Sequence, residues 1–274
     1  MKLLNLGCGS WYHSEWTNVD FISTGKGVIA HNLLEGIPFS NGSFDVVYHS
    51  HVLEHFSKRD GEIFLKECYR VLKPGGIIRI VVPDLEQIAK EYLLNLEKAY
   101  SGDEMAAHNY QWIMLELYDQ TVRETTQGEM GKYWQQPIIP NEQYIRKRMG
   151  SEFTTFRTYL IRDINKPSSK KDVPLAEKIS YYFRKSTYKN KLQRMLLGNE
   201  EAYYELGKFR VGGEVHKWMY DRYSLSTLLK HLQFRECTIS NATNSGIKNW
   251  EKYNLDIHQG EIRKPDSLFM EARK

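Results

Sequence analysis

The sequence predicts an α/β fold with a doubly wound, mostly parallel sheet, and its first 100 residues hold the observations that favour it. Short apolar runs alternate with helical segments from Lys2 to Tyr100. The first run ends in Gly7-Cys8-Gly9, and a second run ends in Asp20. A strand, a tight glycine turn and a second strand that ends in an acid are typical of the nucleotide-binding half of such a sheet.

The glycine turn indicates the kind of ligand. Glycines let the backbone approach a ligand where a Cβ atom would collide, and a short helical turn expected at 11–16 would point N–H groups at an anion. Asp20 is expected to accept hydrogen bonds from ribose hydroxyls. Tyr12 stands where a dinucleotide-binding motif would have its third glycine. S-adenosylmethionine, which has a carboxylate in place of a pyrophosphate, therefore fits better than NAD, although a lone G-x-G also occurs in tight turns without a ligand.

The remaining elements follow from apolar patterning and from turn residues. Ser57 with Asp60 marks a helix start, and Ser224 is expected to cap a later helix. The run at 77–82 is interpreted as an apolar central strand. Strands are expected at 2–6, 17–20, 27–30, 44–49, 77–82, 236–241 and 267–271, helices at 60–72, 85–100, 108–121 and 225–232, and a loop at 127–141.

Five motifs, in this order, resemble the class I S-adenosylmethionine-dependent methyltransferases: Leu4–Gly9, Asn18–Asp20, Ile37–Phe39 with Ser43–Val47, Val52–His55 and Arg70–Gly76. The resemblance covers about the first ninety residues and a section from His216. It implies a Rossmann-like sheet of seven strands whose antiparallel last strand lies beside the sixth. Together with Lys264–Ala272, the motifs are most similar to small methyltransferases associated with surface-polysaccharide synthesis.

The resemblance also assigns a cofactor site. Gly7 and Gly9, with Asn5, would line the methionyl end of S-adenosylmethionine, and Asp20 would bind its ribose. Asn32 and Leu33 would bind the adenine, although Asn32 could equally cap a turn. Ser50, at the end of the fourth strand, would lie beside the sulfonium.

Histidines are the expected catalytic residues. Methyl transfer from a sulfonium is an in-line displacement, and a hydroxyl acceptor also needs a base. We rank His55 first, then His51 and His216, although each could be a structural hydrogen-bonding residue. A metal cluster of His49, His51 and His55 lacks an acid or cysteine at suitable spacing, so no metal is expected.

Residues 101–213 lose the strand–helix alternation and are expected to form a helical insertion after the fifth strand. The division predicted is therefore a core of 1–100 and 214–274, and an insertion that acts as a lid or substrate-binding subdomain. A stretch at 146–194 is basic and aromatic. It could bind phosphate and a sugar or base ring, or it could be a solvated helical face. The connection 244–265 could fold over the substrate side.

Composition restricts the partners. The net charge is +4, which is too mild to indicate nucleic acid. Cys8, Cys68 and Cys237 form no disulfide framework, and no apolar run reaches the roughly 18 residues that span a membrane, so a cytoplasmic protein is expected. The expected acceptor is a small molecule, such as a sugar or a nucleotide-linked compound. An RNA methyltransferase and a non-catalytic protein that keeps the fold stay open, and the oligomeric state is not indicated.

Overall fold

The structure, a computed structural model, describes residues 1–23, 25–164 and 200–274, without the side chains of 160–164. Most of the basic stretch predicted at 146–194 lies outside the described residues. None of the helices in the described ranges combines the length and apolar character needed to cross a bilayer.

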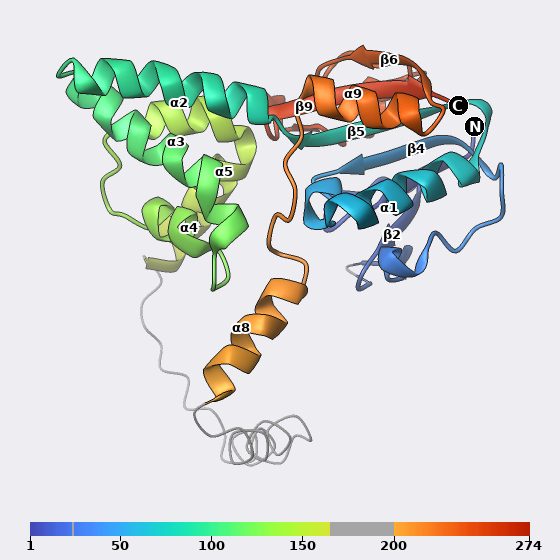
Figure 1. Cartoon of the computed structure of the whole chain (residues 1–274), viewed down its shortest axis with the longest axis horizontal. Coiled ribbons are helices and arrows are strands. Elements are labelled where there is room, and N and C mark those ends of the chain that lie inside the picture. Colours follow the sequence, from blue (N-terminus) through green and yellow to red (C-terminus); the bar gives the residue numbers. More distant parts are fainter. Residues whose placement is uncertain (24, 165–199) are drawn as a thin grey trace.

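The described residues contain a seven-stranded sheet with strand order β3-β2-β1-β4-β5-β9-β6 (Figure 1). The first five strands in chain order run parallel to one another, whereas β9 is antiparallel to both of its neighbours, β5 and β6. This topology confirms the predicted fold class. The strands are β1 (Leu3–Leu6), β2 (Thr17–Asp20), β3 (Val28–Ala30), β4 (Phe44–Ser50), β5 (Leu72–Pro83), β6 (Arg235–Ile239) and β9 (Ser267–Arg273).

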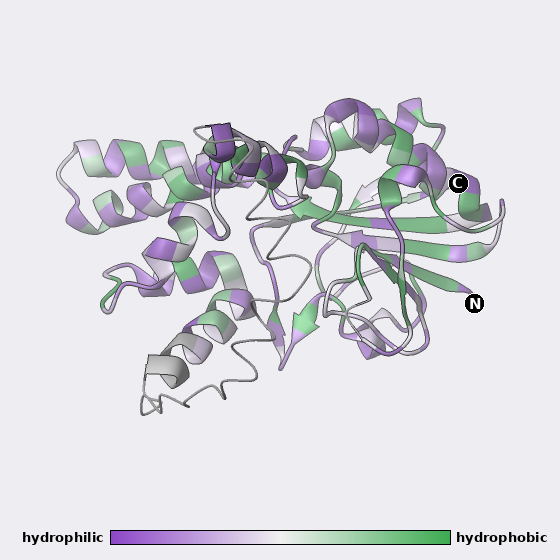
Figure 2. Cartoon of the chain, turned by 90° about the horizontal axis from the view of Figure 1, so that it is seen from below, coloured by the Kyte–Doolittle hydropathy of each residue, from purple (hydrophilic) through white to green (hydrophobic). Residues whose placement is uncertain are grey.

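Both faces of the central strands are buried, because successive side chains point to opposite faces. In β5, Ile78 and Ile80 belong to one apolar cluster, whereas Ile77 and Val81 belong to the other. The helices α1 (Lys58–Val71) and α9 (Arg222–His231) pack on the first face (Figure 1). Figure 2 shows hydrophobic residues along the strands and mixed colouring on the helices.

The second face is covered by the segment 241–257, which contains the short 3₁₀ helix η4 (Trp250–Tyr253). Arg79 of β5 holds this segment in place. Its guanidinium is fully buried, donates to the carboxylates of Asp256 and Glu271 at 2.8 and 2.7 Å, and lies 4.4 Å from the centre of the Trp250 ring. The interpretation of 77–82 as purely apolar overlooked this charge, which the fold accepts because both acids come from distant parts of the chain.

Three local predictions were wrong. Residues 11–16 form turns and no helix, so no helix N-terminus follows the glycine turn. Asp221, rather than Ser224, caps α9. Its carboxylate accepts from the backbone N–H of Ser224, whose hydroxyl bonds back to the Asp221 N–H in a capping box. The predicted loop at 127–141 contains α4 (Gly128–Trp134), because its apolar residues pack into the core of the insertion.

The insertion has its own apolar core, which is built around Trp112, Trp134 and Phe153. Besides α4 it contains α3 (Glu104–Val122), α5 (Glu142–Ile164) and α8 (Glu201–Val211), and α2 (Leu85–Tyr100) packs against α3 (Figure 1). The division into 1–100 with 214–274 and 101–213 remains a prediction, since α2 lies with the insertion in space.

Gly150 allows α5 of the insertion to pack closely against the C-terminal part of the chain. Its φ of +57° kinks α5, and a Cβ atom there would lie 2.1 Å from the carbonyl oxygen of Ile262. Ile262 belongs to a small hairpin of β7 (Ile257–His258) and β8 (Glu261–Ile262). This close approach places the next turn of α5 beside residues 263 and 264.

Candidate functional site

The glycine turn after β1 is held tightly against β2. The backbone N–H groups of Gly7 and Cys8 donate to the carbonyl of Val19, at 2.8 and 3.2 Å. Gly7 has a φ of +62°, and a Cβ atom there would lie 2.3 Å from Cγ2 of Val52. Only glycine therefore fits at this position, for reasons of both backbone conformation and space.

Asp20 closes the turn from the end of β2. Its Oδ2 accepts a hydrogen bond from the backbone N–H of Gly9 at 2.7 Å. A Cβ atom on Gly9 would meet no atom within 4 Å, so this glycine faces open space. A carboxylate can accept several hydrogen bonds, and Asp20 thus keeps the capacity for ribose hydroxyls that the sequence predicts.

A cavity of about 210 Å³, here called the glycine cavity, lies over this turn. The predicted residues Asn5, Gly7, Gly9, Ser50 and His51 all line it. It is also lined by residues that the sequence analysis missed: Trp11, Tyr48, Glu152, Arg263 and Lys264. Arg263 stacks on Trp11, with 4.1 Å from its guanidinium carbon to the ring centre. Glu152 comes from the insertion and Arg263 and Lys264 from the C-terminal connection, so no local motif could have shown that these three residues lie here.

The two predicted asparagines hold local structure. Asn5 is buried, and its Nδ2 donates to the Trp11 carbonyl and to Oδ1 of Asn18 at 3.2 and 3.1 Å. Asn32 caps the 3₁₀ helix η1 (Leu33–Glu35), since its Oδ1 accepts from the N–H of Leu34 at 3.1 Å. The capping alternative is therefore present, and the contacts of Asn32 and Leu33 with adenine remain a prediction.

A second cavity of about 280 Å³, here called the insertion cavity, lies between the insertion and the end of the sheet. Apolar side chains such as Met130, Trp134 and Phe156 line it, together with the buried acid Asp266. The insertion cavity and the glycine cavity share three lining residues, His51, Glu152 and Lys264. The two cavities therefore adjoin.

His51 lies at this junction in an unusual backbone conformation. Its φ is +54°, and its N–H donates to the carbonyl of Val81 at 2.9 Å. Its ring lies between Glu54 and Ser267, with Nδ1 3.1 Å from Oε1 of Glu54 and Nε2 2.9 Å from the Ser267 hydroxyl. Burial holds the pKa of His51 well below its usual range, so the ring is neutral.

His55, which is half-buried, and His216, which is buried, lie next to each other. Their rings meet edge to face, with centres 4.8 Å apart. Burial lowers the pKa of His55 to about 4 and that of His216 well below its usual range. Of the three predicted catalytic histidines, only His51 lines both cavities, whereas the structure places the first-ranked His55 beside His216 and Glu54.

The described part of the basic stretch is used to hold the insertion together. Arg148 is buried and forms a two-pronged ion pair with Glu116, in which Nε lies 2.7 Å from Oε1 and Nη2 lies 2.5 Å from Oε2. Arg157 donates to the carbonyls of Trp134 and Gln136. These two arginines already have protein partners, which favours the structural reading for this part of the stretch.

Comparisons with known proteins agree with the topology. Residues 17–80 match the family model described as a methyltransferase domain. A stretch of 56 residues is 39% identical to a probable S-adenosylmethionine-dependent methyltransferase of Mycolicibacterium smegmatis and covers 20% of this chain and 21% of that relative. The aligned stretch thus spans about one fifth of the relative's length.

Solved structures were also compared with the chain. A SAM dependent methyltransferase from Archaeoglobus fulgidus aligns over 100% of this chain and 86% of its own, with 14% identity and a TM-score of 0.39. A possible histamine N-methyltransferase from Thermotoga maritima aligns over 35% of this chain and 52% of its own, with 26% identity and a TM-score of 0.27. On its motifs, its sheet and the family model, the chain carries a class I S-adenosylmethionine-dependent methyltransferase domain.

Proposed function

We propose that this protein transfers the methyl group of S-adenosylmethionine to a small acceptor bound in the insertion cavity. The observation that carries the proposal is the pair of adjoining cavities, which share His51, Glu152 and Lys264. One cavity lies on the glycine turn and the other lies under the insertion. In-line displacement requires donor and acceptor to meet end to end, and two sites that share a wall provide this arrangement.

In this proposal the glycine turn holds the cofactor. Gly7 and Gly9 let the backbone approach its methionyl end, and Asp20, fixed by the Gly9 N–H, binds the ribose. The cofactor supplies an activated methyl group on a sulfonium, which leaves readily. The remaining task of the protein is to position the acceptor and to exclude water.

The walls of the insertion cavity support a neutral, hydroxyl-bearing acceptor. Nε1 of Trp134 and Oδ1 of Asp266 are buried polar atoms for which the described residues provide no hydrogen-bond partner. The first is a donor, and the second belongs to a carboxyl whose pKa burial raises to about 7. Trp134 and Phe156 add aromatic surface. A sugar, which has apolar faces and hydroxyl edges, matches this combination and agrees with the resemblance to methyltransferases associated with surface polysaccharides.

We assign the base to His51, because it alone of the three predicted histidines lines both cavities. An acceptor hydroxyl that replaces the Ser267 hydroxyl at Nε2 would have a proton acceptor in reach. The unpaired Cys8, Cys68 and Cys237 support a reducing, cytoplasmic setting within the same proposal.

Turnover measurements test the proposal. The purified protein is incubated with S-adenosylmethionine and a panel of free and nucleotide-linked sugars, and formation of the demethylated cofactor is measured. His51→Ala is expected to lower turnover about 100-fold or more while cofactor affinity stays within a few-fold. His231→Ala, at the exposed end of α9, is the matched control and should behave as wild type. Wild-type turnover in His51→Ala would remove this residue from the mechanism.

A further inference from the structure

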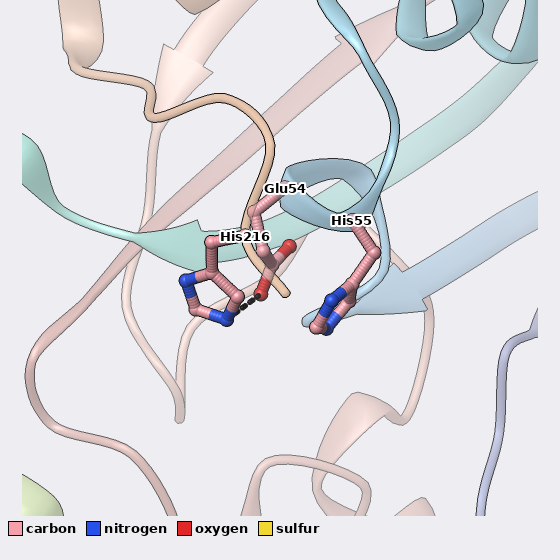
Figure 3. A group of neighbouring side chains, drawn as sticks. All are labelled: Glu54, His55 and His216. Atoms are coloured by element: carbon pink, nitrogen blue, oxygen red, sulfur yellow. Dashed lines mark ion pairs between the residues drawn. The ribbon is translucent and has the colours of Figure 1, made fainter. Parts of the chain in front are cut away.

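The buried Glu54 and His216 form, with the half-buried His55, a group that the proposed reaction does not use. Glu54 and His55 belong to the 3₁₀ helix η2 (Leu53–His55), directly after β4, and His216 lies between α8 and α9 (Figure 3). One nitrogen of each histidine and one oxygen of Glu54 all lie within 4.8 Å of one another. In Figure 3 the three side chains converge on a common space from two chain segments.

The carboxylate of Glu54 lacks a partner that would explain its burial. Its side chain is 0% exposed, and within the described protein neither oxygen forms a hydrogen bond of regular geometry. Its two nearest ion-pair contacts are with neutral imidazoles, at 3.1 Å for His51 Nδ1 and 4.0 Å for His216 Nε2. Lys264, whose charge also acts on Glu54, is paired with Glu152 at 3.1 Å. Burial accordingly raises the pKa of Glu54 to about 8, so without a cation the carboxyl keeps its proton at neutral pH, and a metal ion bound here would take the place of that proton.

The two histidines are in the form that binds metals. Burial keeps both imidazoles neutral, and a neutral imidazole offers a nitrogen lone pair. Nδ1 of His55 lies 3.4 Å from the carbonyl oxygen of Val215, which can only accept a hydrogen bond. The proton is therefore on Nδ1, and Nε2 carries the lone pair. A ligating histidine whose other nitrogen donates to a carbonyl is the usual arrangement in metal sites.

The backbone holds the two halves of the group together. The N–H groups of Lys217 and Trp218 both donate to the main-chain carbonyl of Glu54, at 2.7 and 3.2 Å. The N–H of His216 donates to the carbonyl of Gln120 in α3 at 2.8 Å. His216 is thus fixed opposite Glu54 by regular backbone contacts, and only small side-chain movements are needed to bring three ligand atoms to bonding distance.

We propose that Glu54, His55 and His216 bind a divalent transition-metal ion of the zinc class. Two imidazole nitrogens and one carboxylate oxygen match the ligand preference of Zn²⁺ and leave a further coordination position for water or a ligand. Mg²⁺ prefers oxygen ligands and should bind weakly. The prediction of no metal weighed only histidines close together in sequence, whereas His216 joins the group from the other end of the insertion.

Calorimetric titration of the full chain with ZnCl₂ tests the site. The protein is first stripped of metal by dialysis against a chelator, and neither cofactor nor acceptor is present. One zinc ion per chain is expected for wild type, with no comparable heat from MgCl₂. Glu54→Gln and His216→Ala should each weaken zinc binding about tenfold or more. His231→Ala is the control for adventitious binding and should bind as wild type.

Two further measurements separate loss of a ligand from loss of folding. Far-UV circular dichroism checks each variant, and thermal unfolding should shift upward on addition of zinc for wild type but not for Glu54→Gln. Wild type loaded with Co²⁺ should show visible absorption bands that zinc removes. No zinc uptake by wild type, or equal uptake by Glu54→Gln and His216→Ala, would overturn the proposal. Because the experiment needs no cofactor, its outcome is independent of the proposed methyl transfer.

Discussion

Two buried glutamates, Glu116 in the insertion and Glu54 at the end of β4, are in opposite situations. Glu116 receives both prongs of the Arg148 guanidinium and the indole N–H of Trp112, all from within the insertion. Glu54 is at least as buried, yet among the described residues it has no regular hydrogen bond and no cationic partner, only neutral imidazoles at 3.1 and 4.0 Å. The same residue type is therefore a structural element in one region and an available ligand in the other, and the identity of the neighbours decides which.

Replacing each carboxylate by its amide gives the largest expected contrast. Glu116→Gln leaves Arg148 buried without a counter-charge, and we expect a loss of about 3–5 kcal/mol in the free energy of unfolding. Glu54→Gln, measured on metal-free protein, replaces a carboxyl whose pKa burial raises to about 8 and which is therefore uncharged at neutral pH, so stability should stay within about 1 kcal/mol of wild type or increase. Urea denaturation measures both. Equal losses in the two variants would mean that Glu54 has a partner in the fold.

The next largest difference in stability is expected between alanine variants of Gly7 and Gly9, the two glycines of the turn in the cofactor part of the site. Gly7→Ala must accept both a positive φ and a clash with Val52, so a loss of about 2–4 kcal/mol in unfolding free energy is expected. Gly9→Ala has the strained φ but open space, and about 1 kcal/mol is expected. Cofactor affinity should fall in both. If Gly9→Ala is the more destabilised variant, the turn is not packed as described.

A third buried acid, Asp266, extends the comparison, because it should make the stability of the protein depend on pH. Burial, followed by the charge of Glu116, raises its pKa from 3.8 to about 7. Between these two values the unfolded chain ionises while the folded protein keeps the proton, so stability falls as pH rises. Asp266→Asn lacks this loss. We measure the difference in unfolding free energy between Asp266→Asn and wild type at pH 4 and at pH 8. From pH 4 to pH 8 this difference should shift in favour of the variant by on the order of 2 kcal/mol. A difference that does not change with pH would contradict the raised pKa.

Much of this fold could be predicted because its signals are local. Glycines with positive φ, a strand that ends in Asp20, and the Pro83-Asp84 boundary before α2 are each encoded within a few residues. Where the predictions failed, distant partners decided the structure. Arg79 is tolerated in a central strand only because Asp256 and Glu271 reach it from the C-terminal part of the chain.

The candidate site likewise has one part that local sequence predicts and one part that depends on distant residues. The glycine turn and Asp20 form one unit in sequence and in space. Glu152, Arg263 and Lys264 reach the glycine cavity only because Gly150 lets α5 pack on the hairpin, and His216 meets Glu54 only after the insertion has folded back. Sequence spacing carries no information on such approaches, and so the ranking that placed His55 before His51 rested on motif position alone.

The central claim is that the glycine turn and Asp20 bind S-adenosylmethionine, and calorimetric titration tests it most directly. Wild type should bind the cofactor and its demethylated product with micromolar affinity. Asp20→Ala should bind about tenfold or more weakly with an unchanged far-UV spectrum, because a hydrogen bond to a charged group is lost. No binding to wild type, or equal affinity in Asp20→Ala, would contradict the assignment of this site.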